Sequence, residues 1–412
     1  MANMLSRRAF LTRAGAVGCS LAASPFVTTA SFAALPTDNR LVVIILRGGM
    51  DGLDVLRPWG DAAFAQVRPG LAAERDHALD LDSFYGVHPR MAPLLPLWRA
   101  GELAFIQAVS TPYRNKRSHF DGQDILEAGT PGLEGGPERS GWLNRMLGGM
   151  PGVDARTAYT IGIDPMLLAS GPFPINSWSP DVDVVLSAQG LSLLRVLYEA
   201  DPAYGSALEQ AVALAGQDGD QAIFETAGAP MMDAMQSNMD MGGATGGMRH
   251  VRIAEFAAQQ LAKDARVACF SLGGWDTHRG QLSALNAPVK RLADALVTLK
   301  AGLDDAAWGR TTVLAMTEFG RTVRENGTKG TDHGTGGTMV LAGGALRGGR
   351  VLGHWPGLNE ADLFQRRDLM PTGDVRHWAA WAIRSSFGLE RGFLEDTVFP
   401  GVEMGNDPGL LS

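Results

Sequence analysis

Strand-length apolar runs constrain the fold of this chain most strongly. Residues 41–46 are apolar throughout and rich in β-branched side chains, which is typical of a strand buried on both faces of a parallel sheet. Residues 265–272 and 311–316 are similar runs, and residues 285–303 between them have the spacing of an amphipathic helix. Strand, helix and strand form a βαβ unit, in which both strands run parallel. The sequence therefore predicts an α/β fold.

Further elements follow from the same patterns. Strands are predicted over 103–109 and 338–342, and helices over 89–99, 250–263 and 375–387. His88 and Pro89 open the first of these helices, so we interpret His88 as structural. Residues 34–412 are expected to form a single α/β domain with an irregular insertion at about 130–248, whose Met- and Gly-rich end (231–248) is interpreted as a mobile loop.

The N-terminus has the pattern of a twin-arginine export signal. Arg7 and Arg8 precede Phe10 and Leu11, and a mildly apolar stretch follows. That stretch is rich in Ala and Gly and contains Pro25, so it is not expected to form a stable membrane span. We expect cleavage after Ala33, passage through the twin-arginine translocon during export, and a periplasmic or secreted mature protein.

The charge balance of the mature chain argues against binding of nucleic acid. Removal of residues 1–33 takes away three arginines and no acids, which leaves 33 Lys and Arg against 44 Asp and Glu, a net charge of −11. A surface this acidic does not favour a polyanion. Cys269 is the single cysteine that remains, so no disulfide can form within the mature chain.

Acids and histidines follow several predicted strands directly. They are Asp51, Asp276, His278, Glu318, Asp332 and His333. In open α/β sheets, ligands bind at the carboxyl ends of the strands. Carboxylates and imidazoles there predict a site for a divalent metal ion, with zinc, manganese or calcium as candidates. The alternative is that Glu318 pairs with Arg321 and that Asp332 and His333 only shape a turn.

A basic segment follows the strand predicted over 103–109. Arg114, Lys116 and Arg117 stand beside Ser118 and His119, and together they could hold a small anionic substrate. In the alternative interpretation, Ser118 caps the helix that begins there.

The combination of motifs resembles a known bacterial family of exported proteins. The motifs are the twin-arginine start, Leu-Arg-Gly-Gly-Met-Asp-Gly-Leu, Arg-Ser-His-Phe-Asp, Gly-Gly-Trp-Asp-Thr-His, Thr-Glu-Phe-Gly-Arg-Thr and Gly-Thr-Asp-His-Gly. They resemble the family called domain of unknown function 1501, over nearly the whole mature chain. That family looks related to the alkaline phosphatase and sulfatase superfamily. The resemblance implies a doubly wound, mostly parallel sheet and a two-metal site.

The resemblance also suggests roles for single residues. Asp51 resembles the metal-binding acid at the end of the first strand in that superfamily, and Asp276 with His278 resembles the acid and histidine of one metal site. Asp332 and His333 resemble its Asp-His-Gly ligand pair, a position for which Glu318 competes. The superfamily's nucleophile has no counterpart, because Asn115 stands at the position that precedes His119 by four. Ser118 and Thr111 are the nearby hydroxyls.

Three functions are compatible with these patterns. The first is an exported metal-dependent hydrolase of phosphate or sulfate esters, in which Ser118 or a water attacks, His119 assists, and Arg114, Lys116 and Arg117 balance the charge of the substrate. The second is a non-catalytic metal-binding accessory protein of the cell envelope. The third is a structural protein whose acids are merely solvated, and it is disfavoured because the acids and histidines recur at strand ends.

Overall fold

The structure is a computed structural model that describes most of the predicted mature chain. It covers residues 37–72, 79–114, 116–133, 139–180 and 248–412, with the single residues 195, 197, 198, 205 and 208. The predicted export signal (1–33) and nearly all of the Met- and Gly-rich segment (231–248) lie outside the described residues. The insertion predicted at about 130–248 is described only in part.

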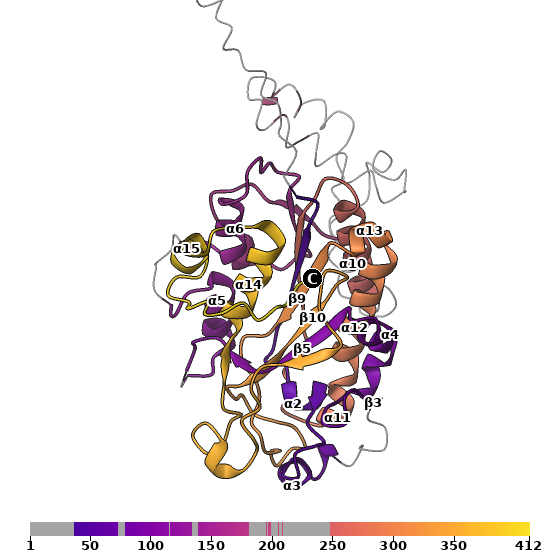
Figure 1. Cartoon of the computed structure of the whole chain (residues 1–412), viewed down its shortest axis with the longest axis vertical. Coiled ribbons are helices and arrows are strands. Elements are labelled where there is room, and N and C mark those ends of the chain that lie inside the picture. Colours follow the sequence, from indigo (N-terminus) through magenta and orange to yellow (C-terminus); the bar gives the residue numbers. More distant parts are fainter. Residues whose placement is uncertain are drawn as a thin grey trace, which may run out of the picture.

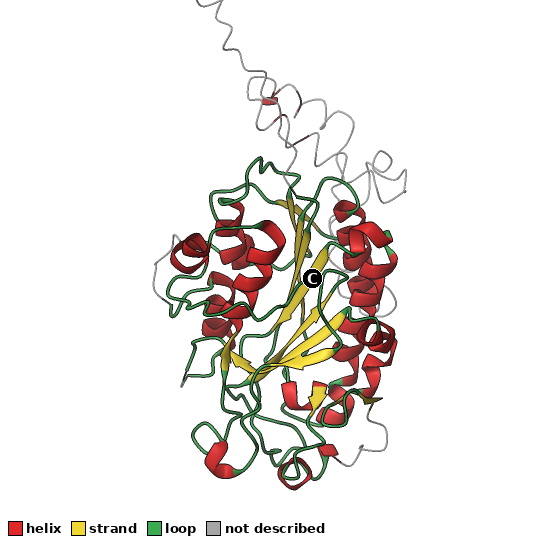
Figure 2. Ribbon diagram, in the orientation of Figure 1, coloured by secondary structure: helices red, strands yellow, loops and turns green. Residues whose placement is uncertain are grey.

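A nine-stranded sheet forms the centre of the fold (Figure 2). Its order is β11 (Arg350–Leu352), β5 (Leu103–Ser110), β10 (Gly337–Ala342), β9 (Thr311–Met316), β1 (Arg40–Leu46), β8 (Val267–Leu272), β6 (Ala158–Ile161) and β7 (Asn176–Trp178), and β12 (Gly373–Asp374) pairs with β5. Among these strands β10 alone is antiparallel to its neighbours. The mostly parallel sheet predicted from the sequence is confirmed.

Helices cover both faces of this sheet, as alternate side chains of β1 show. Leu41, Val43 and Ile45 belong to one hydrophobic core, and Val42, Ile44 and Leu46 to the other. The first core packs against α5 (His119–Ala128), α6 (Trp142–Leu147) and α14 (Val375–Phe387), and the second against α10 (Arg249–Leu261) and α12 (Asn286–Ala301). Figure 1 shows these two groups of helices on opposite sides of the strands. The doubly wound arrangement is confirmed.

The direction of β10 was not evident from its sequence. The chain passes from β9 to β10 through residues 317–336, which contain no helix. A parallel pairing needs a crossover, usually a helix, whereas a return through a loop gives antiparallel neighbours. Both β5 and β9 are antiparallel to β10 and therefore run in the same direction as each other.

The part of the predicted insertion that the structure describes belongs to the main sheet. Residues 139–180 contain α6 and the strands β6 and β7, and β6 pairs in parallel with β8. These strands are only four and three residues long. Such short strands between Gly- and Pro-rich turns have little periodicity, which is why their place in the sheet was not predicted.

Proline breaks the helix predicted over 89–99 into two pieces. Residues Pro89–Leu94 form the 3₁₀-helix η2 and Leu95–Arg99 form α4. Pro93 and Pro96 lack the N–H that an α-helix needs at these positions. The C-terminal helix α14 begins after Asp374, whose carboxylate accepts a hydrogen bond from the N–H of Arg376.

Shorter elements complete the structure. A three-stranded sheet has the order β2 (Leu56–Arg57), β4 (Gly86–Val87) and β3 (Leu79–Asp80). The remaining pieces are α2 (Gly52–Val55), α3 (Phe64–Val67), η4 (Leu167–Ala169), α11 (Gln281–Ala284), α13 (Asp305–Trp308), η8 (Glu360–Asp362), α15 (Arg391–Phe393) and the π-helical turn η9 (Leu394–Val398). Among the residues described, no helix is both long and apolar enough to span a membrane.

His88 is a structural residue whose burial predicts an acid-dependent loss of stability. It is 2% exposed, and its Nδ1 accepts a hydrogen bond from the N–H of Arg90 at the start of η2. Burial lowers the pKa of His88 to about 4 from an ordinary value of 6.5. Between these two pH values the unfolded chain binds a proton at His88 and the folded chain does not, so stability falls as the pH falls.

The variant His88→Asn should reduce this pH dependence. Asparagine can still accept the N–H of Arg90 but does not titrate. Urea unfolding of the native protein should show a loss of up to about 3 kcal/mol between pH 6.5 and pH 4 that the variant lacks. Parallel curves of unfolding free energy against pH for the two proteins would contradict this account.

Candidate active site at the carboxyl edge of the sheet

The candidate site forms where several chain segments leave one edge of the sheet. Residues 111–118 follow β5, residues 273–280 follow β8, and residues 317–336 connect β9 with β10. Because β10 is antiparallel, its amino end lies at the edge where β5, β8 and β9 have their carboxyl ends. In Figure 1 this is the lower edge, where α2 and α11 follow β1 and β8.

Three side chains meet at this edge: His119 from the start of α5, Asp276 from the loop after β8, and His333 from the connection between β9 and β10. His119, Asp276 and His333 each offer a ligand atom, and these atoms all lie within 4.8 Å of one another. The two imidazoles are largely buried, with 24% and 21% of their side-chain surface exposed, whereas the carboxylate is 44% exposed. The group is therefore open to solvent through Asp276. We call these three residues the His/Asp group.

A buried carboxylate orients His119. Its Nδ1 lies 2.7 Å from Oε1 of Glu318, to which it donates a hydrogen bond. Its Nε2 is buried and lies 3.5 Å from Oδ2 of Asp276, and it makes no hydrogen bond to any residue that the structure describes. The hydrogen bond to Glu318 raises the pKa of His119, although burial opposes it. One ring nitrogen is thus fixed in place while the other faces the group without a partner.

Glu318 stands behind His119 and is 0% exposed. Its Oε1 also accepts hydrogen bonds from the N–H of Gly48 (2.9 Å) and from Nε2 of Gln123 (3.2 Å), and its Oε2 accepts one from Thr317 (3.0 Å). Burial raises the pKa of Glu318, but the hydrogen bond from His119, together with those from Gln123 and Gly48, outweighs it and holds the pKa below its ordinary value. The side chain is therefore an anion that supports His119, and it pairs with His119 and not with Arg321.

A backbone carbonyl orients His333. Nδ1 of His333 donates to the carbonyl oxygen of Arg117 at 2.8 Å, and this hydrogen bond places the proton on Nδ1. Nε2 lies 3.4 Å from Oδ1 of Asp276 and 2.9 Å from Nε2 of His278. Burial lowers the pKa of His333, which favours the neutral ring with a lone pair at Nε2.

The turn that supplies this carbonyl is held in an unusual conformation. Arg117 has a φ of +56°, which is uncommon for a residue with a side chain. Its guanidinium lies 3.0 Å from Oδ2 of Asp368, which is 0% exposed and also accepts a hydrogen bond from Thr335 at 2.8 Å. Arg117, predicted to bind substrate, thus uses its side chain to anchor the turn and its carbonyl to hold His333.

His278 and Asp332 border the His/Asp group. Nε2 of His278 lies 3.0 Å from Oδ1 of Asp276, and its Nδ1 lies 3.2 Å from Oδ1 of Asp332. Asp332 also accepts a hydrogen bond from Asn326, which together with His278 holds its pKa below the ordinary value. Asp332 therefore orients His278, just as Glu318 orients His119.

A buried guanidinium fixes Asp276. Arg321 is 1% exposed and donates to Oδ1 of Asp276. Burial raises the pKa of Asp276, but the hydrogen bond and the positive charge of Arg321 outweigh it, so that the pKa lies below its ordinary value. The absence of a side chain at Gly48 lets the backbone at Asp276 pack close to it. The φ of Gly48 is +120°, and a Cβ there would lie 2.7 Å from the backbone nitrogen of Asp276.

The structure places Asp51 in a different network. It is 1% exposed, and its Oδ1 accepts from the N–H of Leu53 as the N-cap of α2. Its Oδ2 accepts hydrogen bonds from Arg68 (2.8 Å) and Gln281 (2.6 Å). Asp51 lies at the end of β1 as predicted, but its oxygens serve the fold and do not join the His/Asp group.

The other predicted residues have varied surroundings. Ser118 caps α5, because its Oγ accepts from the N–H of Asp121 at 3.4 Å. Arg114 donates to the carbonyls of Thr111 and Tyr113, and burial lowers its pKa. Lys116 is exposed.

Several contributors to the site were not predicted. Gln123 could have been found, because it lies four residues after His119 on one helix and so on the same face. No sequence signal points to Asp368 or to the carbonyl of Arg117, which act from distant parts of the chain. Arg321 was considered only as a partner for Glu318.

These features define an α/β protein with a candidate metal centre at the carboxyl edge of a mostly parallel sheet. Residues 38–392 match the family model described as "Protein of unknown function (DUF1501)", and the chain belongs to that family. No curated protein matches the chain.

Solved structures give more distant likenesses. One is the alkaline phosphatase from the Antarctic bacterium TAB5, with 12% identity over 74% of this chain and 92% of that chain and a TM-score of 0.32. A second is the lipoteichoic acid synthase LtaP from Listeria monocytogenes, with 9% identity, 88% and 76% coverage and a TM-score of 0.35. A third is Ps i-CgsB in complex with k-i-k-neocarrahexaose, with 9% identity, 87% and 75% coverage and a TM-score of 0.36. At these scores the chemistry of the site has to be judged from its own side chains.

Proposed function

We propose that this protein is an exported hydrolase of phosphate or sulfate esters that uses a divalent metal ion held by the His/Asp group. The convergence of His119, Asp276 and His333 within 4.8 Å carries the proposal. Two imidazoles and a carboxylate are three protein ligands, the number that catalytic zinc sites use while leaving a fourth position open.

The surroundings of the three ligand atoms fit a metal ion. The Nε2 of His119 is a buried polar atom without a hydrogen-bond partner in the described part of the chain. Nε2 of His333 has a lone pair because Nδ1 carries the proton. Histidines in metal sites usually donate their second N–H to a carboxylate or a carbonyl, and Glu318 and Arg117 supply these acceptors here. Of the three candidate ions, zinc suits two nitrogen ligands best, whereas manganese and calcium prefer oxygen ligands.

The residues around the His/Asp group orient its ligands and can move a proton. When bound, a divalent ion supplies Lewis acidity towards the ester oxygens and lowers the pKa of water. Arg321 keeps Asp276 ionised and fixed, and Glu318 keeps the ring of His119 in one orientation. His278, oriented by Asp332, points Nε2 towards the group and can hold a proton there for the leaving oxygen.

Water is the better candidate for the nucleophile. Ser118 stands next to His119 in the chain, but its Oγ accepts a backbone N–H as the cap of α5. A hydroxyl that fills this role stabilises the helix by about 1 kcal/mol and need not react. Ser118 remains the alternative nucleophile, and one variant separates the two mechanisms.

Metal content should depend on the His/Asp group. We expect His333→Ala and His119→Ala each to lose about one bound ion per chain, because a site with three ligands cannot spare one. Glu318→Gln should still bind the ion at saturation, with affinity reduced by about 10- to 100-fold, because the residue acts through His119. Elemental analysis and zinc titration would measure both effects.

His354→Ala is the matched control, because His354 is exposed in a loop and, among the described residues, only its backbone carbonyl accepts a hydrogen bond, from Thr372. It should retain native metal content. Equal metal content in His333→Ala and His354→Ala would rule out the His/Asp group as the metal site.

Turnover should survive the loss of the Ser118 hydroxyl. With water as the nucleophile, Ser118→Ala is expected to keep its metal and most of its kcat on an aryl phosphate or sulfate, and to lose about 1 kcal/mol of unfolding free energy. Loss of kcat by several orders of magnitude with metal still bound would instead assign attack to Ser118.

If the native, metal-loaded protein hydrolyses no phosphate or sulfate ester, a non-catalytic metal-binding role replaces the hydrolase.

Export should depend on the arginine pair of the predicted signal. Changing Arg7 and Arg8 to lysine is expected to leave the precursor in the cytoplasm, because the translocon reads this pair. Arg13→Lys, outside the pair, is the control and should be exported. Cell fractionation measures the outcome, and normal periplasmic amounts of the double variant would contradict twin-arginine export.

A further inference from the structure

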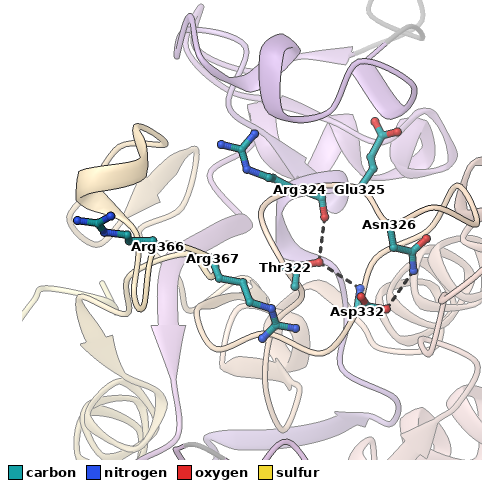
Figure 3. Close-up of a pocket in the computed structure, with 7 residues that line it drawn as sticks. All are labelled: Thr322, Arg324, Glu325, Asn326, Asp332, Arg366 and Arg367. Atoms are coloured by element: carbon teal, nitrogen blue, oxygen red, sulfur yellow. Dashed lines mark hydrogen bonds between the residues drawn. The ribbon is translucent and has the colours of Figure 1, made fainter.

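A small cavity lined by arginines adjoins the His/Asp group. Its volume is about 190 Å³. It is smaller than the pockets of about 300–1,000 Å³ that enclose whole ligands, so its size suits one chemical group. Its lining includes Arg324, Arg366, Arg367, Thr322, Asn326 and Asp332 (Figure 3). Three arginines and two acids line it, so the lining carries a net positive charge of one in a chain that is acidic as a whole.

The acidic groups of the cavity are already engaged. Asp332 accepts hydrogen bonds from Asn326 (3.0 Å) and from Nδ1 of His278 (3.2 Å). Glu325, which also lines the cavity, accepts the N–H of Leu71 at 2.7 Å. Neither acid forms an ion pair with an arginine of the cavity in the described structure. Arg367 is nevertheless compensated, because it pairs with Asp368 at 3.2 Å, so the uncompensated positive charge is mainly that of Arg324 and Arg366.

Two of the three arginines, Arg324 and Arg366, have donors that a ligand can use. Within the part of the chain that the structure describes, the guanidinium of Arg324 has no hydrogen bond and no ion pair. Arg366 is 81% exposed at the rim, and its one ion pair, with Glu360, is 3.9 Å long. Such exposed pairs contribute little. Figure 3 shows the guanidinium groups of Arg324 and Arg367 on opposite sides of Thr322, while Arg366 extends outward.

The backbone that carries these side chains is held firmly. Arg68, which is 0% exposed, donates to the carbonyls of Thr322 and Val323 at 2.8 Å each. Thr322 and Asp368 form an isolated β-bridge, and the hydroxyl of Thr322 donates to the carbonyl of Arg324. The cavity is therefore formed before any ligand arrives, which reduces the cost of binding.

Two residues belong to both the cavity and the neighbouring site. Asp332 lines the cavity, and its carboxylate also orients His278. Arg367 lines the cavity and donates to the carbonyl of His333 at 2.9 Å. The cavity and the His/Asp group are therefore adjacent, separated by Asp332 and Arg367, so one extended molecule can reach both.

We propose that this cavity binds a phosphate or sulfate group that the ester substrate carries at a distance from the bond that is hydrolysed. The substrate class is then an ester with a second oxyanion. Arg324 supplies the planar, forked N–H donors that match such a group, and Arg366 attracts it at the rim. Arg367 contributes positive charge, because its terminal nitrogens already bind Asp368 and the carbonyl of His333. The assignment of the anion to the substrate rests on the proposed function, whereas binding of the anion does not.

Anion binding can be measured without the metal. Calorimetric titration of the full chain, stripped of metal by a chelator, with sodium sulfate and with sodium phosphate at about 0.15 M ionic strength avoids general surface attraction. The native protein should bind one anion, and the double variant Arg324→Gln with Arg366→Gln should bind it at least about tenfold more weakly, because charge-assisted hydrogen bonds are lost. Arg310→Gln, an exposed arginine at the start of β9 that pairs with Asp38, is the control and should bind normally.

A second measurement connects the anion to the substrate. The metal-loaded native protein should have a lower KM for an aryl phosphate that carries a remote sulfate than for the same aryl phosphate without that sulfate. The double variant should lose this difference in KM, while its kcat on the compound without the sulfate should be unchanged. Absence of anion binding by the native protein, or equal binding by the double variant, would overturn the cavity as an anion site. A preference in KM that the double variant retains would overturn the assignment to the substrate. Failure of all esters to react, with anion binding intact, would count against the hydrolase alone.

Discussion

The buried guanidinium of Arg321 is the interaction on which the rest of the site depends. It donates to the backbone carbonyls of Gly48 and Gly49 after β1, Trp275 after β8 and Thr331 before β10, and to the carboxylate of Asp276. A buried cation is tolerated only when its donors are satisfied, and removing the acceptors would leave a large desolvation cost. The loops from three strands are therefore tied to one point, and the ligand atoms keep their positions because that point is fixed.

Each imidazole near this point is oriented by a hydrogen bond at Nδ1. The acceptor is Glu318 for His119, the carbonyl of Arg117 for His333, and Asp332 for His278. The carbonyl of Arg117 is available because the backbone there adopts a left-handed conformation, which costs of the order of 1 kcal/mol or more and persists only when its surroundings enforce it. Asp368 provides that enforcement through the side chain of the same residue.

The sequence predicts the strands and the sheet edge that carries the candidate site, but it does not predict which side chains at that edge face the site. The strand Thr311–Met316 and the helix Val375–Phe387 have the bounds that were predicted, because an apolar run or a capped amphipathic pattern determines them locally. The role of Glu318 could not be determined in this way. Whether a carboxylate at a strand end faces a ligand or supports a neighbour depends on donors such as Gly48 and Gln123, which come from distant segments. Asp51 was interpreted as a ligand for the same reason, since Arg68 and Gln281 give no sign in the sequence that they approach it.

The antiparallel strand at the centre of the sheet has a consequence for the order of assembly. β10 pairs with β9 close to it in sequence, but also with β5, more than two hundred residues earlier in the chain. Such distant pairings form late in folding, after nearer contacts have reduced the entropy of closing the loop. His333 lies four residues before the start of β10, so a chain emerging from the ribosome contains His119 and Asp276 well before it contains the third member of the group. The His/Asp group is therefore complete only after this long-range strand pairing has formed.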